Sequence, residues 1–490
     1  MSKIISTYEI KISDDIPFIE INCELPISEN GEFSLSNWRP GRYEFGNFAK
    51  NIKGLKVFDA SGRVLKCQKI SRNTWRISDF SSQIVKIKYQ YFANELNAGS
   101  TFTDGSFLYV NPVNCLLYST SSFSNQCNVK VLVPDEWQIV GTPNQQFDFT
   151  LENFDRLADT PFITDPTLHS VEFTTQDICF KVTFHGLEGN IHDKLIQDFK
   201  KFTSKQLSDF TYFPSKYYDF IVICPDYKAY HGVEHSSSTI ITLGPKNEIF
   251  NELYTELLGV SSHELYHVWN VKSFRPKEMT PYNFNTENYS RFGYIYEGVT
   301  TYLGDLYLLK SKVFSFEQYF LELEQQINKH ASNNGRYNYS LGDSSVDSWI
   351  DGYVQGVPGR KVSIYTEGCL FAFLLDIEII HLTHGEKSII DFMNALSFFK
   401  EGYDLEDILK ILYDLCSKNF HNFFEQYIDN PTDFVPILEQ KIDLIGLSLE
   451  LSESSLATTE NSDYARKTYK ISKCARLTPK QLKFFNKWCE

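Results

Sequence analysis

Features typical of membrane proteins and of nucleic-acid binders are missing from this sequence of 490 residues. No run of about 18 apolar residues occurs, so we expect no transmembrane helix. The N-terminal stretch Met1–Glu9 lacks the apolar centre of a signal peptide. Acidic residues outnumber basic ones by 62 to 47, and the resulting net charge of −15 argues against a nucleic-acid partner.

Paired cysteine motifs are also missing. The ten cysteines are scattered and none belongs to a C-x-x-C pair, which excludes a cysteine zinc ribbon and a thioredoxin-like redox motif. Cys224, which follows Ile221-Val222-Ile223, is typical in being surrounded by apolar residues, as a small buried side chain would be. Together with the missing signal peptide, this pattern predicts a cytoplasmic protein with reduced thiols.

Internal repeats, low-complexity tracts and phosphate-binding glycine loops are absent as well. The composition that remains is ordinary for a soluble globular protein, with 42% hydrophobic and 22% charged residues. A chain of this length is expected to form about two or three domains.

The segment His263-Glu264-Leu265-Tyr266-His267 is the most informative feature that is present. Its pattern, H-E-x-x-H, places two histidines on one face of a helix, one turn apart. Two imidazoles in that arrangement are suited to bind one Zn²⁺ ion. The glutamate beside the first histidine is within reach of a metal-bound water and is a candidate general base. The motif alone also occurs by chance on solvated helices, so a third ligand is needed to support it.

Glu297 is the candidate for that third ligand. It lies in a segment with helical spacing, in which apolar residues from Ile295 to Leu306 form a stripe. The polar stretch 275–291 before it is typical of a loop. The alternative is an ordinary surface glutamate, but acidic residues in mostly apolar helices are seldom buried unless they are paired or bound to metal. Helix, loop and helix would then carry three ligands and leave one position for water.

Four motifs, in order along residues 230–368, resemble those of one peptidase family. They are Gly232-Val233-Glu234-His235-Ser236, the run His263–Lys272 followed by Arg275-Pro276, the run Glu297–Tyr302, and Ser363-Ile364-Tyr365-Thr366-Glu367-Gly368. The family is that of the glycyl aminopeptidases, zinc metallopeptidases of the gluzincin type in the aminopeptidase N superfamily. Its members commonly continue into a PDZ domain, for which we expect too few residues here.

The resemblance implies a ligand set and a further catalytic residue. One Zn²⁺ ion would be held by His263, His267 and Glu297, with Glu264 as the base. Tyr365 would donate a hydrogen bond to the oxyanion formed during hydrolysis. Only the resemblance selects this residue, since the chain contains 29 tyrosines.

Glu234 would decide the substrate class. A carboxylate on an edge strand near the zinc is suited to bind the free α-amine of a peptide, which would make the protein an aminopeptidase. The resemblance favours this role and implies a preference for small first residues, Gly or Ala. The alternative is that Glu234 is a partner of His235 or of a nearby lysine. The sequence assigns no role to His235, Asn270 or Lys272.

The sequence therefore predicts a zinc aminopeptidase that acts on peptides with a free N-terminus. Two alternatives stay open. A zinc endopeptidase would use the same water chemistry without binding the amine. A non-catalytic peptide-binding protein would keep the fold and lose turnover.

The predicted fold is multidomain. Residues 1–165 contain short alternating or aromatic-rich runs between turn signals, which predicts an N-terminal all-β sandwich. For residues 166–335, strands followed by two metal-bearing helices and the family resemblance imply a thermolysin-like α+β peptidase domain. Residues 336–449 are typical of a mainly helical C-terminal part of the catalytic region. Residues 450–490 begin with a Ser- and Thr-rich stretch and are expected to be a linker and a short tail, in which Phe484-Phe485 is a possible docking element.

Overall fold

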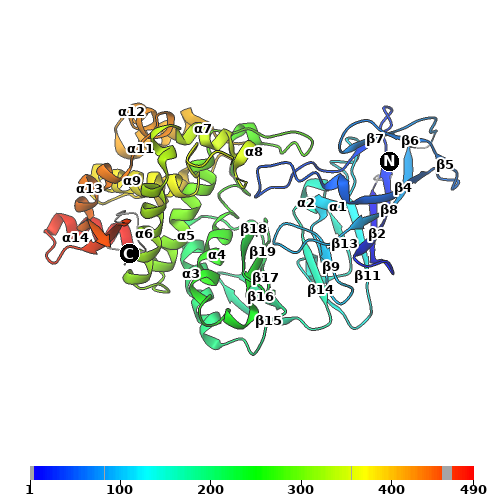
Figure 1. Cartoon of the computed structure of the whole chain (residues 1–490), viewed down its shortest axis with the longest axis horizontal. Helices are drawn as coiled ribbons and strands as arrows, with labels where there is room; N and C mark the ends of the chain where they lie inside the picture. Colours follow the sequence, from blue (N-terminus) through cyan, green and yellow to red (C-terminus); the bar gives the residue numbers. More distant parts are fainter. Residues whose placement is uncertain (1–4, 82, 355, 455–465) are drawn as a thin grey trace, which may run out of the picture. The chain divides into compact units, whose positions relative to one another are not determined.

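The computed structural model describes residues 5–81, 83–354, 356–454 and 466–490 (Figure 1). It divides into two compact units that are interleaved along the chain. The first comprises Met1–Ile196, Pro214–Glu264 and Tyr282–Glu287, and the second comprises Gln197–Phe213, Leu265–Pro281 and Asn288–Glu490. Each unit combines separate stretches of the chain, so this division does not test the expected domain boundaries near residues 165, 335 and 449. Those boundaries stay predictions.

The N-terminal part of the first unit is rich in β-strands, as the sequence predicted. Its largest sheet has the order β13 (Asp148–Leu151), β11 (Cys127–Leu132), β1 (Ser6–Ile12), β2 (Phe18–Pro26), β8 (Ile84–Phe92), β4 (Ile52–Phe58) and β5 (Val64–Leu65). Along β8, buried side chains alternate with exposed ones, which is the period-2 pattern of a strand with one face in the core. The two helices of this part, α1 (Pro112–Cys115) and α2 (Phe154–Ala158), have only four and five residues.

Two smaller sheets complete this part. One has the order β12 (Gln138–Val140), β14 (Phe162–Asp165), β10 (Leu108–Val110) and β9 (Phe102–Thr103), and the other the order β3 (Glu32–Ser34), β7 (Thr74–Ile77) and β6 (Cys67–Lys69). The first of them contributes side chains to a core shared with the next sheet along the chain, for example Tyr109, Val140 and Ile163.

A five-stranded sheet positions the candidate substrate residues. Its order is β15 (His169–Thr175), β16 (Ile178–His185), β17 (Tyr217–Ile223), β19 (Ser238–Gly244) and β18 (Ala229–Glu234). Strand β19 lies between β17 and the edge strand β18 and is buried along its whole length, and accordingly its sequence contains no charged residue. The edge strand β18 pairs antiparallel with β19, and Glu234 is its last residue.

The second unit is mainly helical. Its described helices include α5 (Thr300–Lys310), α6 (Phe316–Ser332), α7 (Leu341–Val346), α8 (Ser348–Asp351), α9 (Thr366–Leu382), α10 (Ile389–Leu396), α11 (Leu405–Cys416), α12 (His421–Phe424), α13 (Val435–Lys441) and α14 (Pro479–Cys489). Helix α9 is buried from Thr366 to Ile380, and α5, α6 and α14 pack against it. The predicted order of a β-rich N-terminal domain, an α+β region and a helical C-terminal part is thus confirmed. None of the helices that the structure describes combines the length and the apolar character that a membrane crossing requires.

The C-terminal tail contains regular structure where the sequence suggested a linker. Residues 450–454 belong to strand β20 (Leu447–Ser454), which pairs with β21 (Arg466–Lys473). Leucines at every second position, from Leu447 to Leu451, provide the strand pattern that the flanking serines obscured. The Ser- and Thr-rich stretch 455–465 lies outside the described residues.

Helix α14 docks on the second unit through its aromatic side chains. Phe484, Phe485 and Trp488 are buried, and the ring of Trp488 lies 5.7 Å from that of Tyr319. The indole Nε1 of Trp488 donates a hydrogen bond of 2.8 Å to the hydroxyl of Tyr302, which in turn donates to Asp376 at 2.7 Å. The docking element suggested by the sequence is therefore present.

Removing this contact should destabilise the protein. We expect Trp488→Ala to lower the free energy of unfolding by about 3–5 kcal/mol, because it empties a fully buried site and leaves the Tyr302 hydroxyl with one fewer partner. A chain shortened to residue 450 should lose more, since β21 and α14 are both removed. Urea unfolding checks both, with Leu482→Ala as the control, because Leu482 is 47% exposed on the same helix. Equal stability of Trp488→Ala and the control would contradict the docking role.

Candidate metal centre and active site

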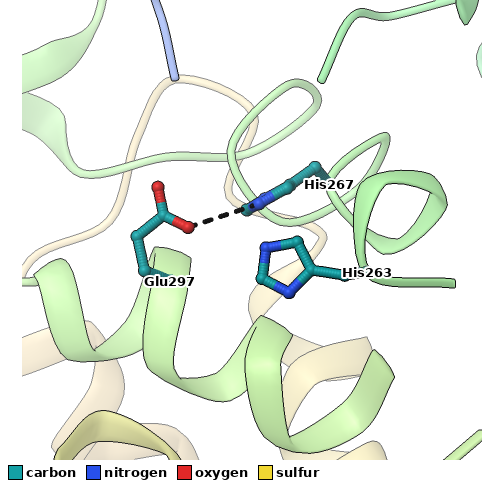
Figure 2. Close-up of side chains that lie close together, drawn as sticks. All are labelled: His263, His267 and Glu297. Atoms are coloured by element: carbon teal, nitrogen blue, oxygen red, sulfur yellow. Dashed lines mark ion pairs between the residues drawn. The ribbon is translucent and has the colours of Figure 1, made fainter. Parts of the chain in front are cut away.

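The two histidines of the H-E-x-x-H motif are carried by helix α4 (Tyr254–Tyr266) and the turn that follows it. His263 lies in the last turn of α4, and His267 comes directly after the helix ends. Figure 2 shows both imidazoles and the Glu297 carboxylate directed toward one another. One ligand atom from each of the three residues lies within 4.8 Å of the other two. The structure therefore brings together all three predicted ligands.

The geometry of His267 fits a bound cation. Its Nδ1 lies 2.9 Å from the backbone carbonyl of Asn270, and a carbonyl only accepts, so Nδ1 donates the hydrogen bond. The other nitrogen, Nε2, is the one that remains for a metal, and it lies 3.4 Å from Oε2 of Glu297. Both side chains are almost fully buried, at 2% and 3% exposure. Two imidazoles with one carboxylate are a ligand set typical of catalytic zinc.

Glu297 is carried by a π-helical turn, η5 (Tyr294–Val299), whose six residues are all buried. Such turns are rare in α-helices and frequent at functional sites, because they change the direction of a side chain without ending the helix. The α-helical spacing assumed from the sequence does not reveal this turn. It continues directly into α5.

Asn270 has a structural role that the sequence did not reveal. Its backbone carbonyl orients His267, and its side-chain amide donates to the carbonyl of Ile295 at 2.8 Å and to the hydroxyl of Thr300 at 3.0 Å. One residue thus fixes the ring of one candidate ligand and the helical turn that carries another. Partners of this kind keep metal ligands oriented and tune their affinity.

Glu264 fits above strand β18 because residue 232 is a glycine. A Cβ atom on Gly232 would lie 2.8 Å from Cδ of Glu264 and closer still to its Oε1, so any larger residue would displace the carboxylate. Carboxylate oxygens of Glu264 and Glu234 and a nitrogen of His267 also lie within 4.8 Å of one another. The candidate base is therefore next to a candidate ligand.

Glu234 is 3% exposed, and its Oε1 has no hydrogen-bond partner among the residues that the structure describes. The alternative partner suggested by the sequence, His235, contacts a different acid. Its Nδ1 lies 3.1 Å from Oδ1 of Asp159, whose Oδ2 accepts a hydrogen bond of 2.5 Å from the hydroxyl of Ser236. The buried Oε1 of Glu234 is therefore suited to a cationic ligand.

Tyr365 is the residue directly before α9, and this end of α9 packs on η5. The approach is close because two glycines meet there: a Cβ on Gly298 would lie 2.5 Å from the carbonyl carbon of Gly368. Glu297 and Tyr365 are thus carried by two segments that are in contact.

Buried ionic contacts hold the first turn of α9. Nδ1 of the fully buried His330 lies 2.5 Å from Oε2 of Glu367, and its Nε2 lies 3.1 Å from Oδ1 of Asp433. Burial opposes protonation of this imidazole, but the two carboxylates outweigh it and raise the pKa of His330. No motif in the sequence indicated this cluster, because its members are far apart along the chain.

Two models of a single family match the chain. The M61 N-terminal domain matches residues 7–164, and the M61 glycyl aminopeptidase domain matches residues 256–371. The chain belongs to the M61 glycyl aminopeptidase family. The family resemblance found in the motifs is thereby confirmed, and membership makes the protein a peptidase.

Solved structures share the fold of this M61 member. An aminopeptidase N family protein from Idiomarina loihiensis has a TM-score of 0.86 at 24% identity, over 91% of this chain and 79% of that one. A mutant M1 zinc metallopeptidase from Deinococcus radiodurans, bound to a Tyr-Ser-Ala substrate, has a TM-score of 0.52 at 11% identity, over 88% of this chain and 94% of that one. No curated protein matches the sequence.

Proposed function

We propose that this M61 peptidase is a zinc aminopeptidase. Its single Zn²⁺ ion would be held by His263, His267 and Glu297, a proposal supported by the close approach of one ligand atom from each of these residues. The observation that carries the choice of an aminopeptidase is the buried carboxylate of Glu234, which lies beside Glu264.

When bound, zinc would lower the pKa of a water molecule and polarise the scissile carbonyl. The residues of the chain then supply the proton transfers. Glu264 accepts the proton of the attacking water and delivers it to the leaving amine. The phenol of Tyr365 donates a hydrogen bond to the developing oxyanion.

Glu234 would bind the α-ammonium of the substrate. An ammonium held by a buried carboxylate is a charge-assisted contact, stronger than a neutral hydrogen bond. Because Glu234 and Glu264 are neighbours, the peptide N-terminus would lie one residue from the bond that is attacked. The substrates are then peptides with a free N-terminus.

The experiment that tests this function compares matched peptides with free and acetylated N-termini. Glu234→Ala should lower kcat/KM for free peptides by about 10²-fold, the usual cost of misplacing the reacting bond, and should leave zinc in place. Glu234→Gln, which keeps the shape and removes the charge, should behave in the same way. Acetylated peptides should be poor substrates for the wild type and for both variants. Internal cleavage of acetylated peptides by the wild type would instead support the endopeptidase alternative, and no turnover of any peptide by the zinc-loaded protein would support the non-catalytic one.

Tyr365→Phe provides a separate test of the oxyanion donor. We expect kcat to fall by about 10²–10³-fold, because one donor to the oxyanion is lost while the ring remains in place. Zinc content should not change, since Tyr365 is not a proposed ligand. Tyr339→Phe is a suitable control on a tyrosine of the same unit. Wild-type kcat in Tyr365→Phe would eliminate the assignment.

Two finer points belong to the proposal. The family name supports a preference for small first residues, Gly or Ala, which a panel of dipeptide amides would test. The ten cysteines form no disulfide in the part of the chain that the structure describes. Such free thiols fit a reducing compartment such as the cytoplasm.

A further inference from the structure

A tight turn from the N-terminal β-rich part reaches the candidate amine site. It consists of Arg39-Pro40-Gly41-Arg42, and the backbone N–H of Arg42 donates to the carbonyl of Arg39 at 3.3 Å. Gly41 has a φ of +77°. Proline at the second position and a glycine with positive φ at the third are typical of a type II turn.

The residues before the turn are firmly held. The indole of Trp38 is completely buried, donates a hydrogen bond of 2.7 Å to the carbonyl of Asn283, and meets the ring of Tyr282 edge-on at 5.3 Å. The side chain of Asn37 donates to the carbonyl of Asn285 at 2.7 Å. The turn therefore has a defined position within the first unit.

A second anchor ties the turn to strand β18. Nη2 of Arg39 lies 3.4 Å from Nε2 of His231, and because a guanidinium only donates, the imidazole accepts. Burial, together with the charges of Arg39 and Arg42, lowers the pKa of His231 to about 3. The imidazole is thus neutral near pH 7 and does not repel the guanidinium.

Gly41 lies directly against the carboxylate of Glu234. A Cβ atom at this position would lie 3.2 Å from Cδ and 3.3 Å from Oε1, and closer still to Oε2. The backbone of the turn therefore covers the Oε2 side of the carboxylate. The other oxygen, Oε1, is the one without a hydrogen-bond partner among the described residues.

We propose that Gly41 is a positioning residue for substrate recognition, because the Arg39–Arg42 turn holds the Glu234 carboxylate in the orientation that directs Oε1 at the substrate ammonium. This inference rests on the proposed function, since it assigns to the N-terminal part a share in binding the amine. Only glycine allows it, because a side chain at residue 41 would occupy the space of the carboxylate and would be strained at this φ.

The test is Gly41→Ala, with Gly54→Ala as the matched control. Gly54 also has a positive φ, of +67°, but a Cβ there would meet nothing within 4 Å, so the control carries the backbone strain without the overlap. We expect Gly41→Ala to lower kcat/KM for a free-amine peptide by about 10–10²-fold, with a rise in KM, because the ammonium contact is misplaced. Zinc content and thermal midpoint should match those of Gly54→Ala. An equal loss of activity in both variants would overturn the proposal.

A double-mutant cycle shows whether Gly41 acts through Glu234. In a Glu234→Ala background the overlapping carboxylate is gone, so adding Gly41→Ala should cause no further loss of kcat/KM. Additive losses would overturn the proposal. If Gly41→Ala alone unfolds, the double variant should regain the thermal midpoint of Gly54→Ala, and failure to do so would also overturn it.

The cycle separates this inference from the proposed function. Glu234→Ala with unchanged cleavage of free peptides rejects the amine-binding role itself. A normal Gly41→Ala beside a crippled Glu234→Ala rejects only the positioning role of the turn.

Discussion

Glu264→Gln should retain its zinc and lose nearly all turnover. An amide has the shape of the carboxylate but does not accept the proton of the attacking water, so we expect kcat to fall by about 10²–10⁴-fold, the usual contribution of a general base. The carboxylate is 6% exposed and is held against Gly232, so its replacement by an isosteric amide should leave the surroundings unchanged. Steady-state kinetics and metal analysis on the same preparation measure both parts of the expectation.

The matched control lies on the same helix. Glu256 is exposed in the first turn of α4, and Glu256→Gln makes the same chemical change away from the ligands. It should keep wild-type kinetics. Full activity of Glu264→Gln would remove Glu264 from the mechanism, and loss of zinc in this variant would show that the residue serves the metal instead.

Loss of a direct ligand should abolish metal binding. We expect His263→Ala, His267→Ala and Glu297→Ala each to reduce zinc content far below one ion per chain and to remove activity with it. The loss of affinity should exceed the roughly 10–100-fold typical of removing a residue that only supports a ligand. Zinc should also leave the wild-type protein at acidic pH, because protons compete for the imidazole nitrogens.

Asn270→Ala provides the comparison within this experiment. It leaves the backbone carbonyl that orients His267 and removes the amide contacts to Ile295 and Thr300, so zinc affinity should fall less than in the ligand variants. Titration of the metal-free variants with zinc measures their zinc affinities and so gives the order of these affinities. A zinc affinity for Glu297→Ala at or above that of Asn270→Ala would place the third ligand elsewhere.

Local patterns in the sequence predicted a large part of the fold. The alternation of apolar and polar residues in 84–92 specifies a strand with one buried face, and β8 has these bounds. The alternation of leucines in 447–451 also specifies a strand. The serine content of this region suggested a linker instead, and that prediction is wrong for residues 450–454, because β20 pairs with β21. Composition is a weaker signal than periodicity when a partner strand lies nearby.

The sequence by itself was enough to propose the metal ligands of this protein. The spacing of His263 and His267 is local, because four residues make about one helical turn, and so the closeness of the two side chains could be predicted without a structure. The structure ends α4 at Tyr266, one residue before His267. Glu297 was a candidate because it is an acidic residue in a mostly apolar helical segment. Only the family motifs selected Tyr365.

The tertiary structure alone decided how these residues are held. The amide of Asn270, which braces the π-turn that carries Glu297, and the contact of Gly41 with Glu234 both join segments far apart along the chain. No local pattern encodes such contacts, because a glycine in a turn has the same local signature whether or not a carboxylate lies against it. Packing of distant backbone segments makes Gly41 and Gly232 part of the site, and that packing is a property of the folded chain.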